Sequence, residues 1–356
     1  MRPSRAIKED VYRKVNEIDY GRRIKRFNDV ECKGASRADF INLIKTLRND
    51  ESDAAVVHKF CGHSDLICRI CEEMMIPDDL YLNENILIQN VFRPEYEEKS
   101  VEQLRRIGKQ LKFQLNKEEV DQVENLTKGQ TTSDLWHLVR IGRITASILK
   151  EAVNSNFDSP PPRQSLLTRI CHPYKCHFDS PAVMYGRNNE KHGKRYARSL
   201  FQDHENVTFH ECGLTIYKDR PYLAASPDLI IKCHCCGTFT VEVKCPYRLR
   251  TNSLLSYQPP LTELINSRDS FLQINENTRD FELVKSHKFY YQVQAQIFIT
   301  NSDFGLFVVW SKREQISIIV HKDVSFWLRC VIKSEQYFYR IILPELLGNA
   351  FSKSLN

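Results

Sequence analysis

The chain contains no run of the roughly 18 apolar residues that a membrane-spanning helix requires. Its opening residues, MRPSRAIKEDVYRK, lack the apolar segment of a secretory signal peptide. The low hydrophobicity of a disordered protein is also absent, since 42% of the residues are hydrophobic and 27% are charged. We therefore expect a globular intracellular protein, nuclear or cytoplasmic, with no membrane partner.

The charge and the cysteine content of the chain are compatible with several function classes and do not identify one. The formal net charge is only +6, so a nucleic-acid partner is permitted but not required, because a basic groove can exist within a nearly neutral whole. Twelve cysteines without a secretory signal favour reduced thiols or a metal site over a disulfide framework. At 356 residues the chain is long enough for one large domain with an extension, or for two domains.

The first third of the sequence is charged and has apolar residues at helical spacing in residues 40–47 and 101–113. We predict a mostly helical N-terminal extension over residues 1–115, whose role the sequence does not indicate. Residues 116–350 form the second predicted domain. Its opening stretch, residues 116–153, predicts two helices joined by a polar turn.

Beyond residue 184 the pattern changes to mixed helices and strands. Periodicity predicts helices at 185–201 and 324–342, and strands at 213–219, 221–232, 238–246, 304–310 and 315–320. Residues 288–300 are ambiguous by period, but the spacing of Gln292, Gln296 and Ile299 favours a helix. This order predicts an α/β fold with a mixed central sheet flanked by helices.

Acidic and basic residues interrupt the apolar strand at residues 238–246. Its period of two places Glu242 and Lys244 on one face, and a glycine-containing connection predicts a hairpin that puts Asp228 across from Glu242. Two facing carboxylates repel unless a cation lies between them, and oxygen ligands favour Mg²⁺ or Mn²⁺. A lysine beside them can orient a water molecule and stabilise charge at a phosphate. The pattern therefore indicates a metal-dependent nuclease.

Glu190 supplies a further carboxylate. It shares the apolar face of the predicted helix 185–201 with two glycines, and an inward carboxylate needs a metal or a hydrogen-bond donor. Two alternatives stay open: a slightly rotated helix would leave Glu190 in water at the rim, and Lys244 could simply neutralise Glu242 on a solvated sheet face.

Six segments in order, LWHLVRIGRITAS, YGRNNEKHGKRYARSLF, IYKD, AASPDLI, VEVKCP and YYQVQAQ, carry a family resemblance. Over about residues 120–310 the chain resembles the phage lambda-type exonucleases, also called YqaJ-like viral recombinases, within the PD-(D/E)XK nucleases. The resemblance implies a restriction-endonuclease-like core. The chain departs from the family at Leu229, where members commonly have the glycine of SPDG, and residues 1–115 have no counterpart in the compact phage enzymes.

The resemblance also implies roles for individual residues. Asp228 and Glu242 correspond to the central magnesium ligands, with the Val243 carbonyl nearby. Lys244 corresponds to the residue that positions the attacking water. Glu190 corresponds to the family's helix carboxylate at a second metal.

Four more positions match family motifs. Gln292 matches the first glutamine of the QxQ helix beside the site, and Asp219 matches an acidic position ahead of the SPD. Arg140 and Ser147 correspond to residues that hold the 5′-phosphate end of DNA, a role that suits an arginine fork and a hydroxyl near a helix start. Each has a plainer interpretation: a turn aspartate, an exposed helix arginine, a serine bonded to the local backbone, and a glutamine that only hydrogen-bonds the sheet.

The cysteines raise a separate hypothesis of structural Zn²⁺. Cys233, Cys235 and Cys236 crowd the predicted hairpin tip, and further cysteines and histidines occur in CHPYKCHF and CGHSDLICRIC. A structural zinc site needs four ligands within tetrahedral reach. The spacing alone leaves zinc ligation and ordinary helical placement of these residues both open.

Together these observations predict a magnesium-dependent DNA exonuclease that hydrolyses phosphodiester bonds from the 5′ end of double-stranded DNA, in recombination, repair, or viral or mobile-element replication. The resemblance implies a ring-like homotrimer around DNA and a partner that anneals single strands. An endonuclease of the same fold is the enzymatic alternative. An inactive DNA-binding protein is the other, and it would be expected to have lost Asp228, Glu242 or Lys244.

Overall fold

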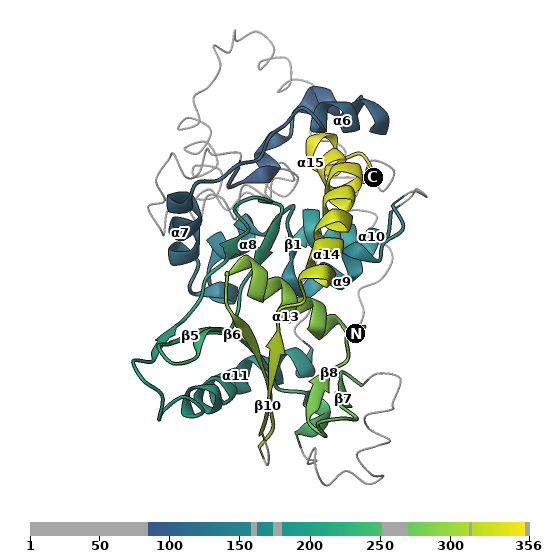
Figure 1. Ribbon diagram of the computed structural model, residues 1–356. Helices are drawn as coiled ribbons and strands as arrows, with labels where there is room; N and C mark the ends of the chain where they lie inside the picture. The colour runs from purple at the N-terminus through teal and green to yellow at the C-terminus, as the bar shows by residue number, and fades with distance from the viewer. Residues whose placement is uncertain (1–84, 158–161, 174–179, 251–269, 313–314, 353–356) are drawn as a thin grey trace, which may run out of the picture. The chain divides into compact units, whose positions relative to one another are not determined.

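The structure is a computed structural model that describes residues 85–157, 162–173, 180–250, 270–312 and 315–352 (Figure 1). The chain divides into two compact units, Met1–Cys68 and Arg69–Asn356, and every described residue belongs to the second. The helix expected at residues 40–47 and the cysteines of residues 61–71 lie outside the described ranges. Within those ranges, no helix is long and apolar enough to cross a membrane.

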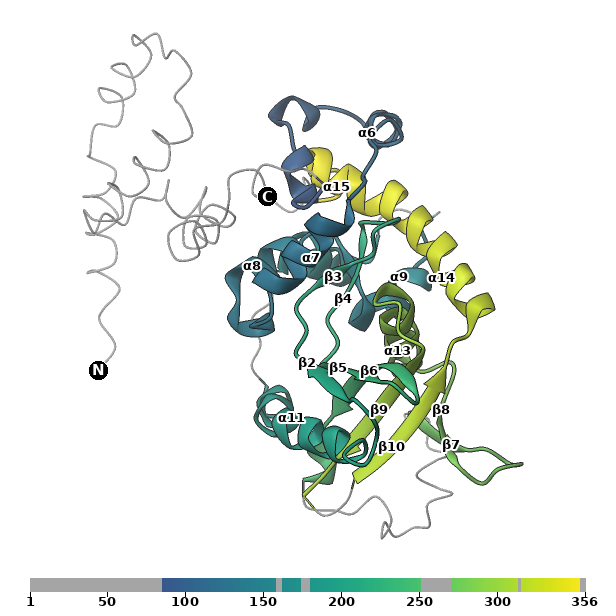
Figure 2. The ribbon, with the colours of Figure 1, turned by 60° about the vertical axis from the view of Figure 1, so that its left-hand side comes forward.

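The main sheet of this unit is mixed and five-stranded, with strand order β10-β9-β6-β5-β2 (Figure 2). The strands are β2 (Thr208–His210), β5 (Leu229–Cys233), β6 (Gly237–Lys244), β9 (Phe304–Trp310) and β10 (Gln315–His321). The central pair β6 and β9 is parallel, and the other neighbours are antiparallel. The predicted α/β class with a mixed central sheet is confirmed.

Two predicted helices, α11 (Pro181–Ser199) and α13 (Lys288–Ile299), lie on opposite sides of this sheet, as Figure 2 shows. The alternation along β6 explains the arrangement, because Val241 and Val243 pack into the apolar cluster on the α11 side. Glu242 points the other way and contacts α13. The charged Glu242 side chain is thus tolerated on a buried face because α13 donates hydrogen bonds to it.

The predicted strand 221–232 is wrong as a single element. It divides into β4 (Leu223–Ala225) and β5, which belong to different sheets. β4 pairs with β1 (Ile144–Thr145) and β3 (Thr215–Ile216) in a separate three-stranded sheet. The chain changes sheets at residues 226–228, so Asp228 occupies the junction.

The second helix predicted within residues 116–153 is also interrupted. α8 (Asp134–Val139), capped by the Ser133 side chain, ends before Gly142, whose φ of +76° is a left-handed conformation that favours glycine. The chain then forms β1, a 3₁₀ turn (Ala146–Ile148) and α9 (Leu149–Val153). Ser147 consequently lies in a turn rather than inside a long helix.

The helices that precede α8 begin with capping boxes. Asn116 and Glu119 bond reciprocally at the start of α7 (Lys117–Leu126). α6 (Val101–Gly108) begins likewise, ends earlier than the predicted 101–113 helix, and packs against α15 (Leu343–Gly348). The extension over residues 1–115 stays a prediction, but its described residues share a core with the C-terminal helix.

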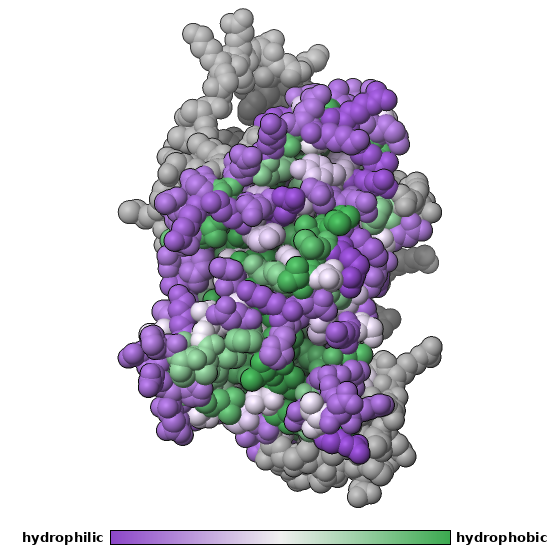
Figure 3. Space-filling model, viewed as in Figure 1, coloured by the Kyte–Doolittle hydropathy of each residue, from purple (hydrophilic) through white to green (hydrophobic). Residues whose placement is uncertain are grey.

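The remaining elements complete the described unit. They are α10 (Gln164–Cys171), the hairpin β7 (Leu272–Ile274) and β8 (Phe281–Leu283), α14 (Val324–Tyr337), and the π-helical turn Phe338–Ile342 that joins α14 to α15. Val324, Leu328 and Ile332 lie on successive turns of α14 and are more than half exposed. In Figure 3 hydrophobic side chains gather over the middle of the face where α14 runs in Figure 1. This side of α14 faces away from the unit's own core.

Candidate active site

Two predicted acidic residues meet at the base of the β5–β6 hairpin. The register pairs Leu229 with Val241, which puts Asp228 at the position opposite Glu242. Asp228 is 9% exposed and Glu242 is 3% exposed. The Val243 N–H donates to Asp228 Oδ2 at 2.6 Å, and the Asp228 N–H donates to the Val241 carbonyl at 3.0 Å. The backbone therefore fixes the carboxylate beside the end of β6.

Burial raises the pKa of Asp228 well above its usual range, and the negative charges of Glu242 and Glu190 raise it further. The Lys244 charge and the Val243 N–H act in the opposite direction without restoring the ordinary value. A buried carboxyl under this repulsion gains most from a proton or a cation.

The α13 helix holds Glu242 through two glutamines. Gln292 Nε2 donates to Glu242 Oε1 at 2.6 Å, and Gln296 Nε2 donates to Oε2 at 2.5 Å. Gln294, on the opposite side of α13, bonds the backbone at His321 instead. Sequence reasoning found Gln292 and missed Gln296, although the separation of four residues places both on one helical face.

Lys244 lies next to both acids. Its ammonium pairs with Glu242 Oε1 and lies 5.0 Å from the centre of the Phe289 ring. Burial disfavours its charge, yet the charges of Glu242 and Asp228 outweigh this and raise the pKa of Lys244. Lys244 is therefore held at the site as a cation. This agrees with the burial of the two acids, whose charge solvent alone does not neutralise.

Glu190 reaches the site from α11, and a close helix–strand approach brings it there. A Cβ at Gly193 would lie 2.2 Å from Val243 Cγ1, so only glycine permits this spacing, whereas a Cβ at Gly186 would meet nothing within 4 Å. The Glu190 side chain is 34% exposed and forms an ion pair of 2.9 Å with Lys194. Glu190 is therefore partly buried, and it lies between the two positions that the sequence allowed, one facing inward and one in water at the rim.

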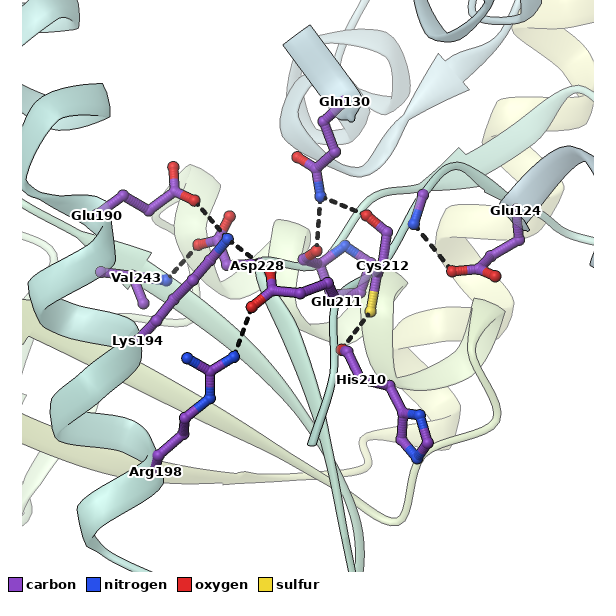
Figure 4. A network of polar contacts seen from close by, with 12 residues as sticks. Glu124, Gln130, Glu190, Lys194, Arg198, His210, Glu211, Cys212, Asp228 and Val243 are labelled. Carbon is purple, nitrogen blue, oxygen red and sulfur yellow. Dashed lines mark hydrogen bonds and ion pairs between the residues drawn. The ribbon is translucent and has the colours of Figure 1, made fainter. Parts of the chain in front are cut away.

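Lys194 is a site neighbour that sequence reasoning missed. Figure 4 shows its amine between the carboxylates of Glu190 and Glu211, and the Glu211 contact is 3.1 Å. Burial opposes its charge, but the hydrogen bond and charge of Glu190, with Asp228 and Glu211, raise the pKa of Lys194. A second cation thus balances the acids on the α11 side.

A cation with two hydroxyls lies on the α8–β1 segment. Arg140 Nη2 is 3.5 Å from Thr145 Oγ1, which is 3.3 Å from the exposed Ser147 hydroxyl. The Arg140 guanidinium stacks 3.8 Å from the Trp136 ring centre, and burial together with the Arg169 charge lowers the pKa of Arg140 to about 10. Arg140 remains charged at neutral pH, and this group suits a phosphate.

Gln130 and Trp136 donate hydrogen bonds to the junction that carries Asp228. Trp136 Nε1 donates to Ser226 Oγ at 2.9 Å. Gln130 Nε2 donates to the carbonyls of Cys212 and Pro227 at 2.8 and 3.0 Å (Figure 4). Gln130 and Trp136 therefore position the loop that carries Asp228, a role that no local sequence pattern could indicate.

Asp219 is the one acidic candidate that the structure does not bring to this cluster. It lies exposed in the turn between β3 and β4, where the Tyr217 and Leu223 backbones bond each other. Among the described residues, no hydrogen bond or ion pair connects its carboxylate to the other acids. Its plainer interpretation as a turn residue fits this position.

A pocket of about 550 Å³ opens beside the cluster. Glu190 and Lys244 line it together with Lys288, Tyr247 and Phe289. Lysine and aromatic side chains next to acidic ones give the pocket groups for a phosphate and for a base or sugar face.

The donor set fits a hard divalent cation at Asp228 and Glu242. Asp228 Oδ2 alone of its two oxygens bonds another described residue. Glu242 Oε2 accepts one hydrogen bond and keeps a lone pair, whereas Glu242 Oε1 already accepts from both Gln292 and Lys244. Within the described ranges, Asp228, Glu242 and Glu190 do not gather their carboxylate oxygens within 4.8 Å of one another. Because Glu190 is held by Lys194, Asp228 and Glu242 are the pair of carboxylates that would hold such a cation.

Comparison with known proteins gives one family match and several distant structural likenesses. A sequence profile described as viral alkaline exonuclease matches residues 40–245. Proteins named alkaline nuclease from Autographa californica nuclear polyhedrosis virus and Orgyia pseudotsugata multicapsid polyhedrosis virus are 27% and 24% identical over 228 residues. The match covers 60% of this chain and 49% and 48% of theirs, so the chain spans about half the length of these curated relatives.

Two solved structures share part of the arrangement. The alkaline exonuclease LHK-Exo of Laribacter hongkongensis gives a TM-score of 0.41 at 16% identity, over 60% of this chain and 94% of that one. The shutoff and exonuclease protein of Kaposi's sarcoma associated herpesvirus gives 0.40 at 14% identity, over 73% of this chain and 78% of that one.

Proposed function

This chain belongs to the viral alkaline exonuclease family, and from that premise we propose that it is a divalent-metal-dependent DNA exonuclease acting on the 5′ end of duplex DNA. The observation that carries the proposal is the meeting of Asp228, Glu242 and Lys244 at the base of one hairpin. A cation and two buried carboxylates at the mouth of a pocket suit hydrolysis of a phosphodiester.

The chain's own residues have separate roles in this proposal. Asp228 and Glu242 would hold Mg²⁺ or Mn²⁺, which would supply Lewis-acid stabilisation of charge on the phosphate. Lys244 places a positive charge beside the reacting group and orients water. Gln292 and Gln296 keep the Glu242 carboxylate in one rotamer, so little reorganisation is needed when the substrate binds.

Glu190 has a conditional role. Its ion pair with Lys194 must open before the carboxylate can join the metal ligands. If a DNA phosphate pairs with Lys194, the Glu190 carboxylate is released and would be free to ligate a second metal. If Glu190 stays paired, it only orients Lys194 toward the substrate. The Val243 N–H already holds Asp228, and the carbonyl of the same residue would complete the proposed first metal site.

Preference for a 5′ end rests on Arg140 and Ser147. With Thr145 between them, they offer a guanidinium fork and two hydroxyls to a terminal phosphate. The Trp136 ring stacks on Arg140, and its indole N–H donates to the Ser226 hydroxyl just ahead of Asp228. The residues proposed to bind the DNA end therefore contact the loop that carries a proposed metal ligand. The expected homotrimer and the single-strand annealing partner are further parts of this proposal.

The test uses the full chain with three substrates: linear duplex with a 5′ phosphate, linear duplex with a 5′ hydroxyl, and closed circular duplex. Each is incubated with Mg²⁺, Mn²⁺ or chelator, and wild type is compared with Asp228→Asn. We expect metal-dependent release of mononucleotides from linear ends, fastest with the 5′ phosphate, and none from the variant. Cutting of the circle would indicate the endonuclease, and DNA binding without any cleavage would indicate an inactive binding protein.

A further inference from the structure

A cluster of one imidazole and three thiols lies at the other end of the hairpin that carries the acids. It consists of His204, Cys233, Cys235 and Cys236, and one ligand atom from each lies within 4.8 Å of all the others. Within the residues that the structure describes, no other group of histidine, cysteine and acidic side chains reaches this density. Nothing in the proposed nuclease chemistry uses these residues.

The local fold brings the four residues together from two segments. Cys233 ends β5 and pairs with Gly237, whose φ of +90° closes a three-residue tip containing Cys235 and Cys236. His204 comes from the turn that follows α11. A backbone hydrogen bond of 3.1 Å from His234 to Glu205 joins this turn to the hairpin tip.

The separations are equal to or up to about 0.8 Å shorter than the edges of a zinc tetrahedron, so small side-chain movements would admit the ion. Nδ1 of His204 lies 3.5, 3.3 and 3.3 Å from the sulfurs of Cys233, Cys235 and Cys236, and Cys235 Sγ lies 3.0 and 3.5 Å from its two sulfur neighbours. Bond lengths of about 2.3 Å for Zn–S and about 2.0 Å for Zn–N give tetrahedron edges of about 3.5–3.8 Å.

A disulfide is the competing arrangement for closely spaced cysteines, and the structure does not show one. The shortest sulfur separation, 3.0 Å between Cys233 and Cys235, exceeds the roughly 2.05 Å of a disulfide. All described cysteines are free. Thiols are weak hydrogen-bond donors, so mutual contacts among them give little reason to hold three at one turn.

We propose that His204, Cys233, Cys235 and Cys236 bind one structural zinc ion. Four protein ligands of the Cys₃His type close the coordination shell and leave no position for a substrate. The set is soft, whereas the acidic site offers oxygen, so the two sites select different metals. The neighbouring His234 is outside the cluster, because its side chain is 76% exposed and approaches Glu205 instead.

The zinc site fastens the elements that carry the acidic cluster. The β5–β6 hairpin holds Asp228 and Glu242 at its base, and α11 brings Glu190 alongside. Zinc would tie the hairpin tip to the turn that follows α11, where the Phe201 ring lies 5.0 Å from the His204 ring in a tilted contact and 5.0 Å from the Phe239 ring in an edge contact. The ion therefore stabilises the relative position of α11 and β6 from outside the reaction centre.

The first measurement is zinc content of the purified full chain by mass spectrometry, for wild type, His204→Ala, Cys235→Ser and the matched control His234→Ala. We expect both ligand variants to hold one zinc fewer per chain than wild type, and His234→Ala to hold the same amount. The difference between variants is the readout, since residues outside the described ranges contain more cysteine and histidine. Equal zinc content in all four proteins would overturn the proposal.

Two further measurements, a rescue variant and a cobalt spectrum, distinguish loss of the metal site from failure of a variant to fold. His204→Cys keeps four ligands, so it should retain the zinc that His204→Ala loses. Cobalt-substituted wild type should show thiolate-to-cobalt charge transfer and tetrahedral visible bands, reduced in Cys235→Ser. Removal of zinc from wild type should lower its melting temperature by at least about 5 °C. A cobalt protein without these bands, or zinc retained by His204→Ala, would contradict the assignment.

Discussion

At the scale of single residues, the site is organised around charge that the fold keeps out of water. Asp228 and Glu242 are buried opposite each other, and Lys244 together with two glutamines compensates them only in part. Such an arrangement costs stability in the metal-free protein because an ionised carboxylate is poorly solvated there. The cost should be measurable as a dependence on pH.

Asp228→Asn is therefore expected to stabilise the chain while it abolishes activity. Because the pKa of Asp228 is raised in the folded protein, its contribution to stability is full below the unfolded value of about 3.8 and is lost as pH rises through the raised folded value. Asparagine has no such loss, so with chelator the variant should melt about 2–4 °C above wild type in alkaline buffer. The gap should shrink in acid, and a variant that melts lower at every pH would contradict this account.

The substitution Gln296→Met tests whether Gln296, which the sequence did not identify as a site residue, supports turnover by holding Glu242. Loss of its bond leaves Glu242 Oε2 without that donor, so we expect turnover to fall at least about tenfold with little change in DNA affinity. Gln294→Met is the matched control, since Gln294 is equally buried on α13 but bonds backbone atoms at His321 and Asp323. It should lose stability yet keep its turnover per folded molecule. Equal turnover losses in both would assign the Gln296 effect to packing.

The sequence predicts these residues unevenly, for physical reasons. Asp228, Glu242 and Lys244 were found because strand alternation and hairpin register are local properties. Gln296, Lys194 and other partners depend on how a helix is rotated against a strand, which no single segment encodes. Their roles in catalysis stay predictions until they are measured.

At the scale of elements, the distance between α11 and β6 sets where Glu190 lies. The contact is made at Gly193, where a methyl group would collide with Val243. Val243 is β-branched and cannot easily move aside, so a small change at one helical position displaces the whole helix.

Gly193→Ala should lower both melting temperature and nuclease rate, since α11 must move away from β6. Gly186→Ala, two turns earlier on the same helix, meets nothing and should melt no lower than wild type, with a gain of up to about 1 kcal/mol from helix propensity. Thermal unfolding of the two single variants gives the comparison. A Gly193→Ala protein as stable as Gly186→Ala would show that the close approach is not required.

The element predictions failed where long-range pairing decided the outcome. Residues 221–232 show continuous strand character, yet Ser226–Asp228 divides them because β4 pairs with β1 and β5 pairs with β6. Gly142 likewise ends α8 within a helical pattern. Helix α13 was predicted correctly although its period is ambiguous, because Gln292, Gln296 and Ile299 recur at helical spacing. Strands β9 and β10 were predicted as neighbours, and they pair.

At the scale of the whole molecule, the group proposed to bind the DNA end, on the α8–β1 segment, is connected to the proposed cutting site on the hairpin. The connection runs from Arg140 through Trp136 to Ser226, just ahead of Asp228. Arg140→Ala should reduce the rate on 5′-phosphorylated duplex at least about tenfold and leave the rate on 5′-hydroxyl duplex nearly unchanged. The exposed Arg106 of α6 supplies the control, and Arg106→Ala should keep the wild-type preference. A preserved preference in Arg140→Ala would place end recognition elsewhere.

The measurement that tests the central claim most directly is the rate of label release from 5′-phosphorylated linear duplex in Mg²⁺ by wild type, Lys244→Ala and Lys232→Ala. Lys232 is exposed on β5 of the same hairpin, so its variant removes an equal charge outside the site. We predict release by wild type and Lys232→Ala at similar rates, and a rate at least about 100-fold lower for Lys244→Ala with DNA binding retained. Undiminished release by Lys244→Ala would contradict the assignment of the hairpin base as the active site.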